Sequence, residues 1–174
     1  LWNRDNNSAK SLFWDGRVEV LDPKNKIFRS PLKEILPKGL ENILAVQALF
    51  PLARDDEMLG LPGDNSPKYL PPKHANLPNE LSEGAKNLMG PKKIMAVHSL
   101  LMERLLGLKR NKLKTWQIEY RKLFQEAYPD KSTSEFSIVE LGNAIAHFEE
   151  IAFATRNTPW DEYLSGNNNV ISKN

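Results

Sequence analysis

Prolines set the strongest limit on the fold of this chain. Twelve of its 174 residues are proline, and a proline inside a helix removes a hydrogen bond and clashes with the preceding turn. Pro23, Pro31 and Pro37 leave no room for a long helix near the beginning, and residues 59–78 hold five more prolines among Gly, Asp and Asn. Long helices are therefore expected after Pro91, a residue type that suits a helix start.

The segments before residue 59 predict short elements. Residues 1–17 are expected to form a loop. The stretch "VEVL" (18–21) alternates like a strand and "KIFRS" (26–30) can pair with it, which allows one short β-hairpin. Residues 39–50 have the spacing of an amphipathic helix that Pro51 ends. The apolar face predicted for this helix is Leu40, Ile43, Leu44 and Ala48.

Three later segments, residues 91–108, 115–128 and 137–154, have the spacing of amphipathic helices around one core. Thr115 is the expected N-cap of the second, and Ser137 with Glu140 has capping-box spacing at the third. The buried faces predicted are Ile94, Val97, Leu101, Leu105 and Leu108 in the first helix, Tyr120, Leu123, Phe124 and Ala127 in the second, and Ile138, Leu141, Ile145, Phe148 and Ala152 in the third. The predicted fold class is all-α.

Composition points to one globular unit. The chain is 40% hydrophobic and 26% charged, enough for a single core. Within it we distinguish a segment over 1–58, a proline-rich loop over 59–90, a helical bundle over 91–166 and a tail over 167–174. The loop is long enough to be a functional lid, an interface or a disordered segment.

Charge and residue usage exclude several classes of function. The net charge is +2, with 24 basic and 22 acidic residues mixed along the chain, so nucleic acid is not an expected partner. No apolar run approaches the roughly 18 residues of a membrane span. The absence of cysteine rules out disulfides, thiolate metal sites and the CxxCH motif that attaches a c-type haem within these residues.

Spacing alone does not assign a role to the candidate site residues, and it leaves two interpretations for Gln47 and for Trp14. Gln47 falls on the apolar side of its helix and is either a bracket for a loop or a group offered to a site. Glu57 follows "ARDD" in a turn and reads first as part of a solvated acidic cluster. Trp14 beside an Asp–Gly turn is either an apolar anchor or, between two redox centres, an electron relay. His98 and Met102 share one side of one helix, so they cannot clamp an iron from opposite faces.

Four motifs, taken together and in order, resemble the di-haem cytochrome c peroxidase family, which includes the di-haem enzymes that mature a tryptophan-derived quinone cofactor. The family's "N…FWDGR" is matched by Asn3 and residues 13–17, and its "Q…P…EM" by Gln47, Pro51, Glu57 and Met58. Its "Y..LF..AFP" resembles residues 120–129, with Tyr128 in place of Phe. Its "AI..FE" and "TPFDRYLxGN" resemble residues 144–167. The resemblance covers nearly the whole chain.

Such proteins are similar to two fused cytochrome c domains, each with a CxxCH haem. The resemblance implies a cytochrome-c-like helical fold for this chain and places it between the two haem motifs. The chain is then an excised central portion, or part of a variant whose haem segments are separate. Two haems c would be attached outside it, and an interdomain calcium would also take its ligands from outside.

The resemblance also implies roles for particular residues. Trp14 matches the tryptophan between the haems and is expected on the electron path. Glu57 and Gln47 match residues on the distal side of the peroxidatic haem, with Glu57 as acid and base for the O–O bond and Gln47 as a hydrogen-bonding group. Supporting roles fall to Met58 and Pro51 in the pocket, and to Asp15 and Arg17, which would fix the turn that presents Trp14.

The implied activity is the reduction of hydrogen peroxide with electrons from a small donor protein, a cytochrome c or a cupredoxin. The resemblance also implies a periplasmic location, a homodimer and contacts with flanking haem-bearing segments. The chain is longer than the short peroxidases between Arg17 and Gln47 and over 59–90, so the proline-rich loop is expected to cover the haem pocket or a partner surface. No metal ligand is assigned, and His74, His98 and His147 stay outside the site. The alternative is a cofactor-free helical interaction module on the same scaffold.

Overall fold

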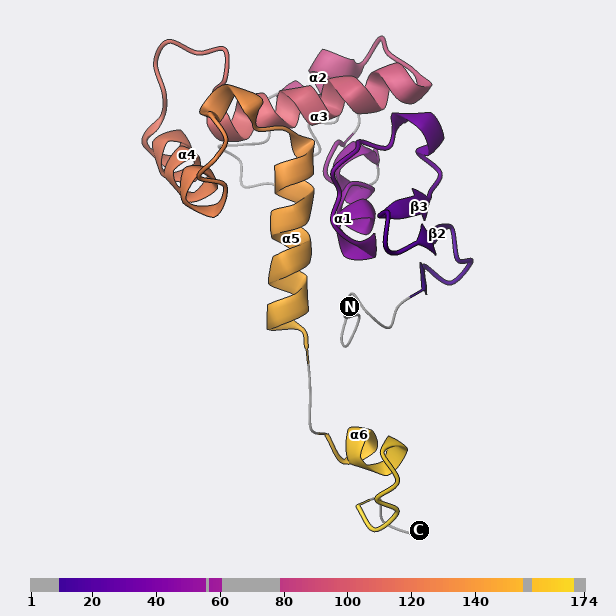
Figure 1. The fold of residues 1–174 in the computed structure, drawn as a ribbon. Helices are drawn as coiled ribbons and strands as arrows, with labels where there is room; N and C mark the ends of the chain where they lie inside the picture. Colours follow the sequence, from indigo (N-terminus) through magenta and orange to yellow (C-terminus); the bar gives the residue numbers. More distant parts are fainter. Residues whose placement is uncertain (1–9, 56, 61–78, 155–157, 171–174) are drawn as a thin grey trace, which may run out of the picture.

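The computed structural model describes residues 10–55, 57–60, 79–154 and 158–170. Helices dominate this part of the chain, and one small sheet lies beside α1 (Figure 1). The predicted all-α fold with a short hairpin is confirmed. Asn3, His74 and most of the proline-rich stretch lie outside the described residues. The division of the chain into four segments stays a prediction.

The sheet has three antiparallel strands in the order β1-β2-β3. β2 (Val18–Asp22) and β3 (Ile27–Arg29) form the predicted hairpin, with Val20 opposite Phe28. β1 (Ser11–Leu12) pairs with β2 and was not predicted, because two residues are too few to show an alternating pattern. Leu12 and Val18 are buried and join the sheet to the main core.

α1 (Ile43–Ala48) packs along α5 (Ile138–Ala152) at the centre of that core. α1 is shorter than predicted, because the Asn42 side chain caps it by accepting from Ala45 N. The two helices approach closely at Gly142, where an added Cβ would lie 3.2 Å from the Ala45 carbonyl oxygen. Asn143 on α5 fixes the entry to α1, since its Oδ1 accepts from Glu41 N at 3.0 Å and its Nδ2 donates to the Gly39 carbonyl at 3.1 Å.

The buried face of α5 differs from the predicted one. The expected capping box is present, with Ser137 N and Oγ donating to Glu140 Oε2 at 2.8 and 2.9 Å. Ile138 is buried as predicted, but Phe148 is 62% exposed and Ala152 is exposed. The contact with α1 needs small side chains, so the helix turns Gly142, Asn143 and Ala146 inward. The buried positions are Ile138, Glu140, Gly142, Asn143 and Ala146.

α2 (Glu80–Ala85) and α3 (Gly90–Leu106) pack against each other beside the 3-10 turn η2 (Pro51–Ala53). The loop expected over 59–90 is thus interrupted by a helix whose cap is Asn79. Val97 and Leu101 are buried on α3 as predicted, and Ile94 and Leu105 pack against the core. Leu108 lies beyond the helix, which ends at Gly107 with φ of +59°.

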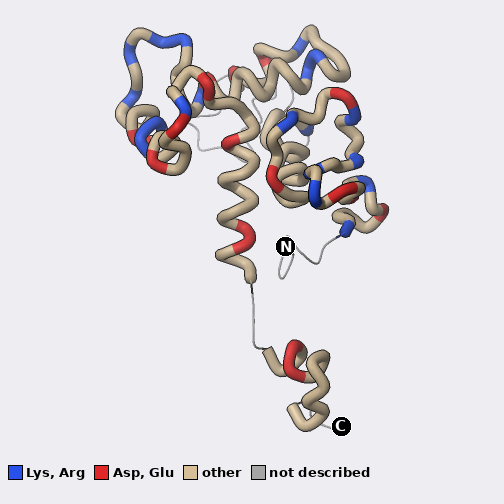
Figure 2. The backbone as a smooth tube through the Cα atoms, viewed as in Figure 1, with Lys and Arg blue, Asp and Glu red and all other residues tan. Residues whose placement is uncertain are grey.

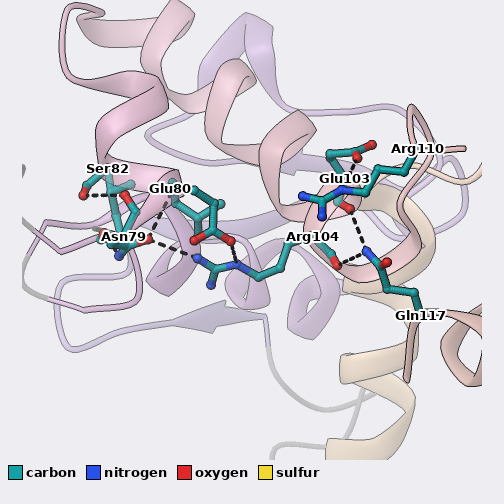
Figure 3. Close-up of polar contacts among 9 residues, drawn as sticks. Asn79, Glu80, Ser82, Glu103, Arg104, Arg110 and Gln117 are labelled. Carbon is teal, nitrogen blue, oxygen red and sulfur yellow. Dashed lines mark hydrogen bonds and ion pairs between the residues drawn. The ribbon is translucent and has the colours of Figure 1, made fainter. Parts of the chain in front are cut away.

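The predicted inner face of α4 (Thr115–Ala127) is wrong at three of four positions. Phe124 is buried, but Tyr120 and Leu123 are 41% and 59% exposed and Ala127 is exposed. A polar residue occupies the contact instead: Gln117, 1% exposed, donates from Nε2 to the Arg104 carbonyl at 2.9 Å (Figure 3).

Thr115 is not the cap of α4 but its first helical residue. The cap position is Lys114, whose backbone N–H donates to Gln117 Oε1 at 3.0 Å. On the same side of α4, Arg121 donates to the Leu106 and Gly107 carbonyls at 2.7 and 3.0 Å. The carbonyl groups at the end of α3 are therefore satisfied by α4 side chains, which explains why polar residues face inward here.

The remaining elements are the 3-10 turns η1 (Lys33–Ile35) and η3 (Thr133–Glu135) and the short helix α6 (Pro159–Leu164), which lies apart from the other helices (Figure 1). Acidic and basic residues are both distributed along the described chain, and several Lys and Arg residues lie close together in the loop between α3 and α4 (Figure 2). Among the described helices, none has the length and apolar character required to cross a membrane.

Candidate functional site

The turn at residues 13–17 is held by bonds within itself. Phe13 and Gly16 have φ of +66° and +63°, and Gly16 N donates to the Phe13 carbonyl at 3.2 Å. Arg17 Nε donates to both Asp15 carboxylate oxygens at 2.9 and 3.0 Å, and Arg17 N donates to Asp15 Oδ1 at 3.2 Å. The hydrogen bond from the Arg17 side chain is the main cause of a lowered Asp15 pKa. The expected Asp–Arg pair is therefore present.

The same turn presents Trp14 to the outside. Trp14 is 93% exposed, so the anchor interpretation of this tryptophan is wrong. Its neighbour Phe13 provides the packing, because the Phe13 ring meets the Phe50 ring edge-on with centroids 5.6 Å apart, and the Arg17 guanidinium lies over Phe13 at 5.1 Å. A large indole held on a tied turn is free to contact another segment or another molecule.

Gln47 lies in the last turn of α1 among residues that are fully buried. Its Oε1 is itself buried and accepts no hydrogen bond from any described residue. This oxygen therefore does not bracket a loop within the described residues. A buried amide oxygen without a partner has a free-energy cost, and in native structures such groups call for an explanation, one of which is a role at a site.

Glu57 and Met58 lie on a turn that folds back onto η2, the 3-10 turn that follows α1. Met58 N donates to the Pro51 carbonyl, and Glu57 N donates to the Arg54 carbonyl, each at 3.2 Å. The Glu57 side chain is 43% exposed, and its Oε1 lies 3.7 Å from Arg54 Nε. Met58 is 40% exposed. The carboxylate is thus accessible to solvent and within reach of a cation.

Phe50 and Pro51 connect these pieces. The Phe50 ring contacts Phe13 on the turn that carries Trp14. The backbone N–H of Phe50 donates to the Gln47 carbonyl at 3.1 Å, and the carbonyl of the next residue, Pro51, accepts from Met58 N. The structure therefore brings the FWDGR turn, the end of α1 and the Glu57 turn to one place. Trp14 itself points out of this group, since nearly all of its surface is exposed.

The two described histidines, His98 and His147, take no part in this group. His98 is 7% exposed, its Nε2 is buried without a described partner, and burial lowers its pKa to about 4. It lines a cavity of about 250 Å³ together with Met102 and Phe136. His147 is exposed and its Nδ1 lies 3.8 Å from Glu150 Oε2. In the part of the chain that the structure describes, no three His, Cys, Asp or Glu side chains are grouped as metal ligands would be.

Sequence reasoning did not single out Phe50 or Asn79. The spacing predicts Phe50 as the last residue of a helix, and nothing in that spacing shows that it joins two motifs. Asn79 has a usable signal, because an Asn just before "ELSEGA" suits an N-cap, but the proline-rich composition around it predicts a loop.

A family model described as di-haem cytochrome c peroxidase matches residues 2–169. The chain belongs to the di-haem cytochrome c peroxidase family. The family consists of haem-dependent, peroxidase-like oxidoreductases, which supports an enzyme of that general kind. No curated protein and no solved structure matches the chain.

The haems of this family can be tested against the residues present. Thioether attachment of a c-type haem uses two cysteines, and the 174 residues contain none, so these residues do not attach one. They do fit the wall of a haem pocket in one respect, because Gln47 offers a buried oxygen that no described residue uses.

Proposed function

We propose that this chain forms the peroxide side of a haem pocket in a di-haem peroxidase, with Glu57 and Gln47 as its polar groups. The observation that carries the proposal is the Oε1 of Gln47, which is buried and has no hydrogen-bond partner among the described residues. Gln47 lies at the end of α1, and the Glu57 turn is bonded to η2, which follows that helix. The haem-bearing segments are proposed to be attached elsewhere in the same protein or in a partner chain.

Reduction of hydrogen peroxide to two waters consumes two electrons and two protons, and breaks the O–O bond. A haem, when bound, supplies the redox chemistry of that cleavage. Glu57 would accept a proton from one peroxide oxygen and deliver it to the other, which leaves as water. Its exposed side chain can exchange protons with solvent between turnovers.

Gln47 would orient the peroxide rather than move a proton. A neutral amide neither gains nor loses a proton at physiological pH, and its Oε1 can accept a hydrogen bond from a peroxide O–H. Because that oxygen is already buried and no described residue bonds to it, accepting the bond carries little additional desolvation cost. Met58 and Pro51 would shape the pocket wall beside these two groups.

Trp14 would carry electrons between the two haem segments. The support is its exposure on a turn that Asp15 and Arg17 hold in one conformation. A small donor protein, a cytochrome c or a cupredoxin, would supply the electrons, and the protein would act in the periplasm.

The test uses the intact protein. A pyridine haemochrome assay should find two c-type haems. Glu57→Gln should slow peroxide turnover by about 10²- to 10⁴-fold, the rate enhancement that general acid–base catalysis usually contributes, with haem content unchanged. Glu126→Gln, which alters an exposed carboxylate on α4, is the matched control and should keep full turnover. Unchanged turnover in Glu57→Gln would refute the role of Glu57. A colourless intact protein would instead establish the cofactor-free interaction module.

A further inference from the structure

The turn that carries Glu57 is linked to neighbouring residues by backbone hydrogen bonds. Its backbone is closed by Met58 N on the Pro51 carbonyl and by Glu57 N and Leu59 N on the Arg54 carbonyl, all at 3.2 Å. Among the described residues, the Glu57 side chain makes a long, partly exposed ion pair with Arg54. A turn of this kind needs outside contacts to hold a carboxylate in one position.

Asn79 supplies one such contact from the beginning of α2. Its Nδ2 donates to the Leu59 carbonyl at 2.6 Å, two residues after Glu57. Leu59 is fully buried in the main core, so this carbonyl is held between the core and Asn79. A second link is an ion pair from Lys93 on α3 to Asp55, at 2.7 Å.

The orientation of the Asn79 amide is fixed from the other side. Its Oδ1 accepts from Leu81 N at 3.1 Å and from Arg104 Nη2 at 3.0 Å, and Arg104 Nε donates to Glu80 Oε1 at 2.6 Å (Figure 3). Because two donors meet the oxygen, the NH₂ group must be the end that faces Leu59. Arg104 and Glu80 therefore determine where the Asn79 donor points.

We propose that Asn79, oriented by Arg104, is a positioning residue for Glu57. The inference rests on the proposed function, since it assumes that Glu57 moves a proton. It deepens that function by assigning the group that keeps the carboxylate at the correct distance from the peroxide. Small displacements are costly in catalysis, because about 1 Å of misplacement can lower the rate by a factor near 10².

A merely structural role for Asn79 can be separated from this one. Capping of α2 uses only Oδ1, whereas the bond to Leu59 uses only Nδ2. Asn79→Asp keeps an oxygen for Leu81 N and for Arg104 and removes the donor to Leu59. The variant therefore preserves the helix cap, removes the positioning bond and places a carboxylate oxygen against the Leu59 carbonyl. Asn87→Asp, at an exposed residue just after α2, is the matched control.

The experiment measures two quantities on the intact, haem-loaded protein. Peroxide turnover should fall about 10- to 100-fold in Asn79→Asp, and the double variant with Glu57→Gln should be no slower than Glu57→Gln alone. Amide hydrogen exchange should become faster over residues 57–59 and stay unchanged in α5. Asn87→Asp should match the parent protein in both measurements.

The outcomes distinguish the two claims. If Glu57→Gln slows turnover but Asn79→Asp does not, or if the two losses multiply, positioning by Asn79 is refuted while the role of Glu57 stands. Unchanged exchange over residues 57–59 also refutes it. If Glu57→Gln leaves turnover unaffected, the proposed function and this inference both fail.

Discussion

Burial of His98 should make the stability of this protein fall as the pH drops from 7 to 5. The imidazole is 7% exposed, and desolvation lowers its pKa from 6.5 to about 4. The unfolded chain therefore binds a proton near pH 6.5 that the folded protein does not bind until about pH 4. Below pH 6.5 protonation lowers the free energy of the unfolded state, while the folded state does not yet bind the proton. The free energy of unfolding therefore decreases.

The size of the effect follows from the two pKa values. Linkage gives a loss of about 2 kcal/mol in the free energy of unfolding between pH 7 and pH 5, and about 3 kcal/mol at the acid limit. Glu103 and Lys109 line the same cavity as His98. The Glu103 carboxylate is already bonded to Arg110 Nε at 3.0 Å and to Lys109 N at 2.8 Å, and His98 Nε2 has no hydrogen-bond partner among the described residues.

Urea unfolding of the intact protein at pH 7, 6 and 5 measures the effect. In His98→Leu, where no proton can bind, most of the loss between pH 7 and pH 5 should disappear. His147→Gln removes an exposed imidazole and should keep the parent's pH dependence. An equal loss in His98→Leu and in the parent would show that other groups cause the acid sensitivity and that the burial argument is incorrect.

Two further changes test the helix contacts. Gly142→Ala should lower the free energy of unfolding by about 1–3 kcal/mol, because the new Cβ would meet the Ala45 carbonyl and Leu49 at 3.2 Å. Alanine is otherwise favoured over glycine in a helix, so a gain in stability would contradict the close approach. Gln117→Ala should cost about 2–3 kcal/mol in urea unfolding, since it leaves buried backbone groups at the α3–α4 junction without a partner. The same change at exposed Gln125 should cost clearly less, and equal losses would argue against the importance of burial.

The sequence predicted elements whose signals are local. The hairpin followed from alternation in residues 18–21 and a paired segment, and the α5 start from the spacing of Ser137 and Glu140. The inner face of α4 could not be predicted in the same way. Apolar spacing counts Gln117 as a solvent-facing residue, and only the carbonyl groups ending α3 give it a reason to be buried.

The candidate site shows the same division. The Asp15–Arg17 bond joins neighbouring residues and could be anticipated, and Gln47 could be recognised as a polar residue on an apolar face. The convergence at Phe50 and the bond from Asn79 to Leu59 depend on tertiary contacts, the latter between residues 20 apart. For Trp14 the sequence left an anchor and an electron relay both open, because a sequence shows that an indole is large but not whether anything covers it.

The small sheet also has a consequence for the behaviour of the protein at high concentration. β3 is an outer strand of only three residues, its pairing with β2 shifts register between Val20 and Asp22, and Arg29 at its end is paired with Glu19. Short, irregular and charged edges offer little template for a strand from a second molecule. This edge is therefore protected against the growth of intermolecular β-structure, and if the protein aggregates, we expect the exposed apolar surfaces of the helices to be responsible.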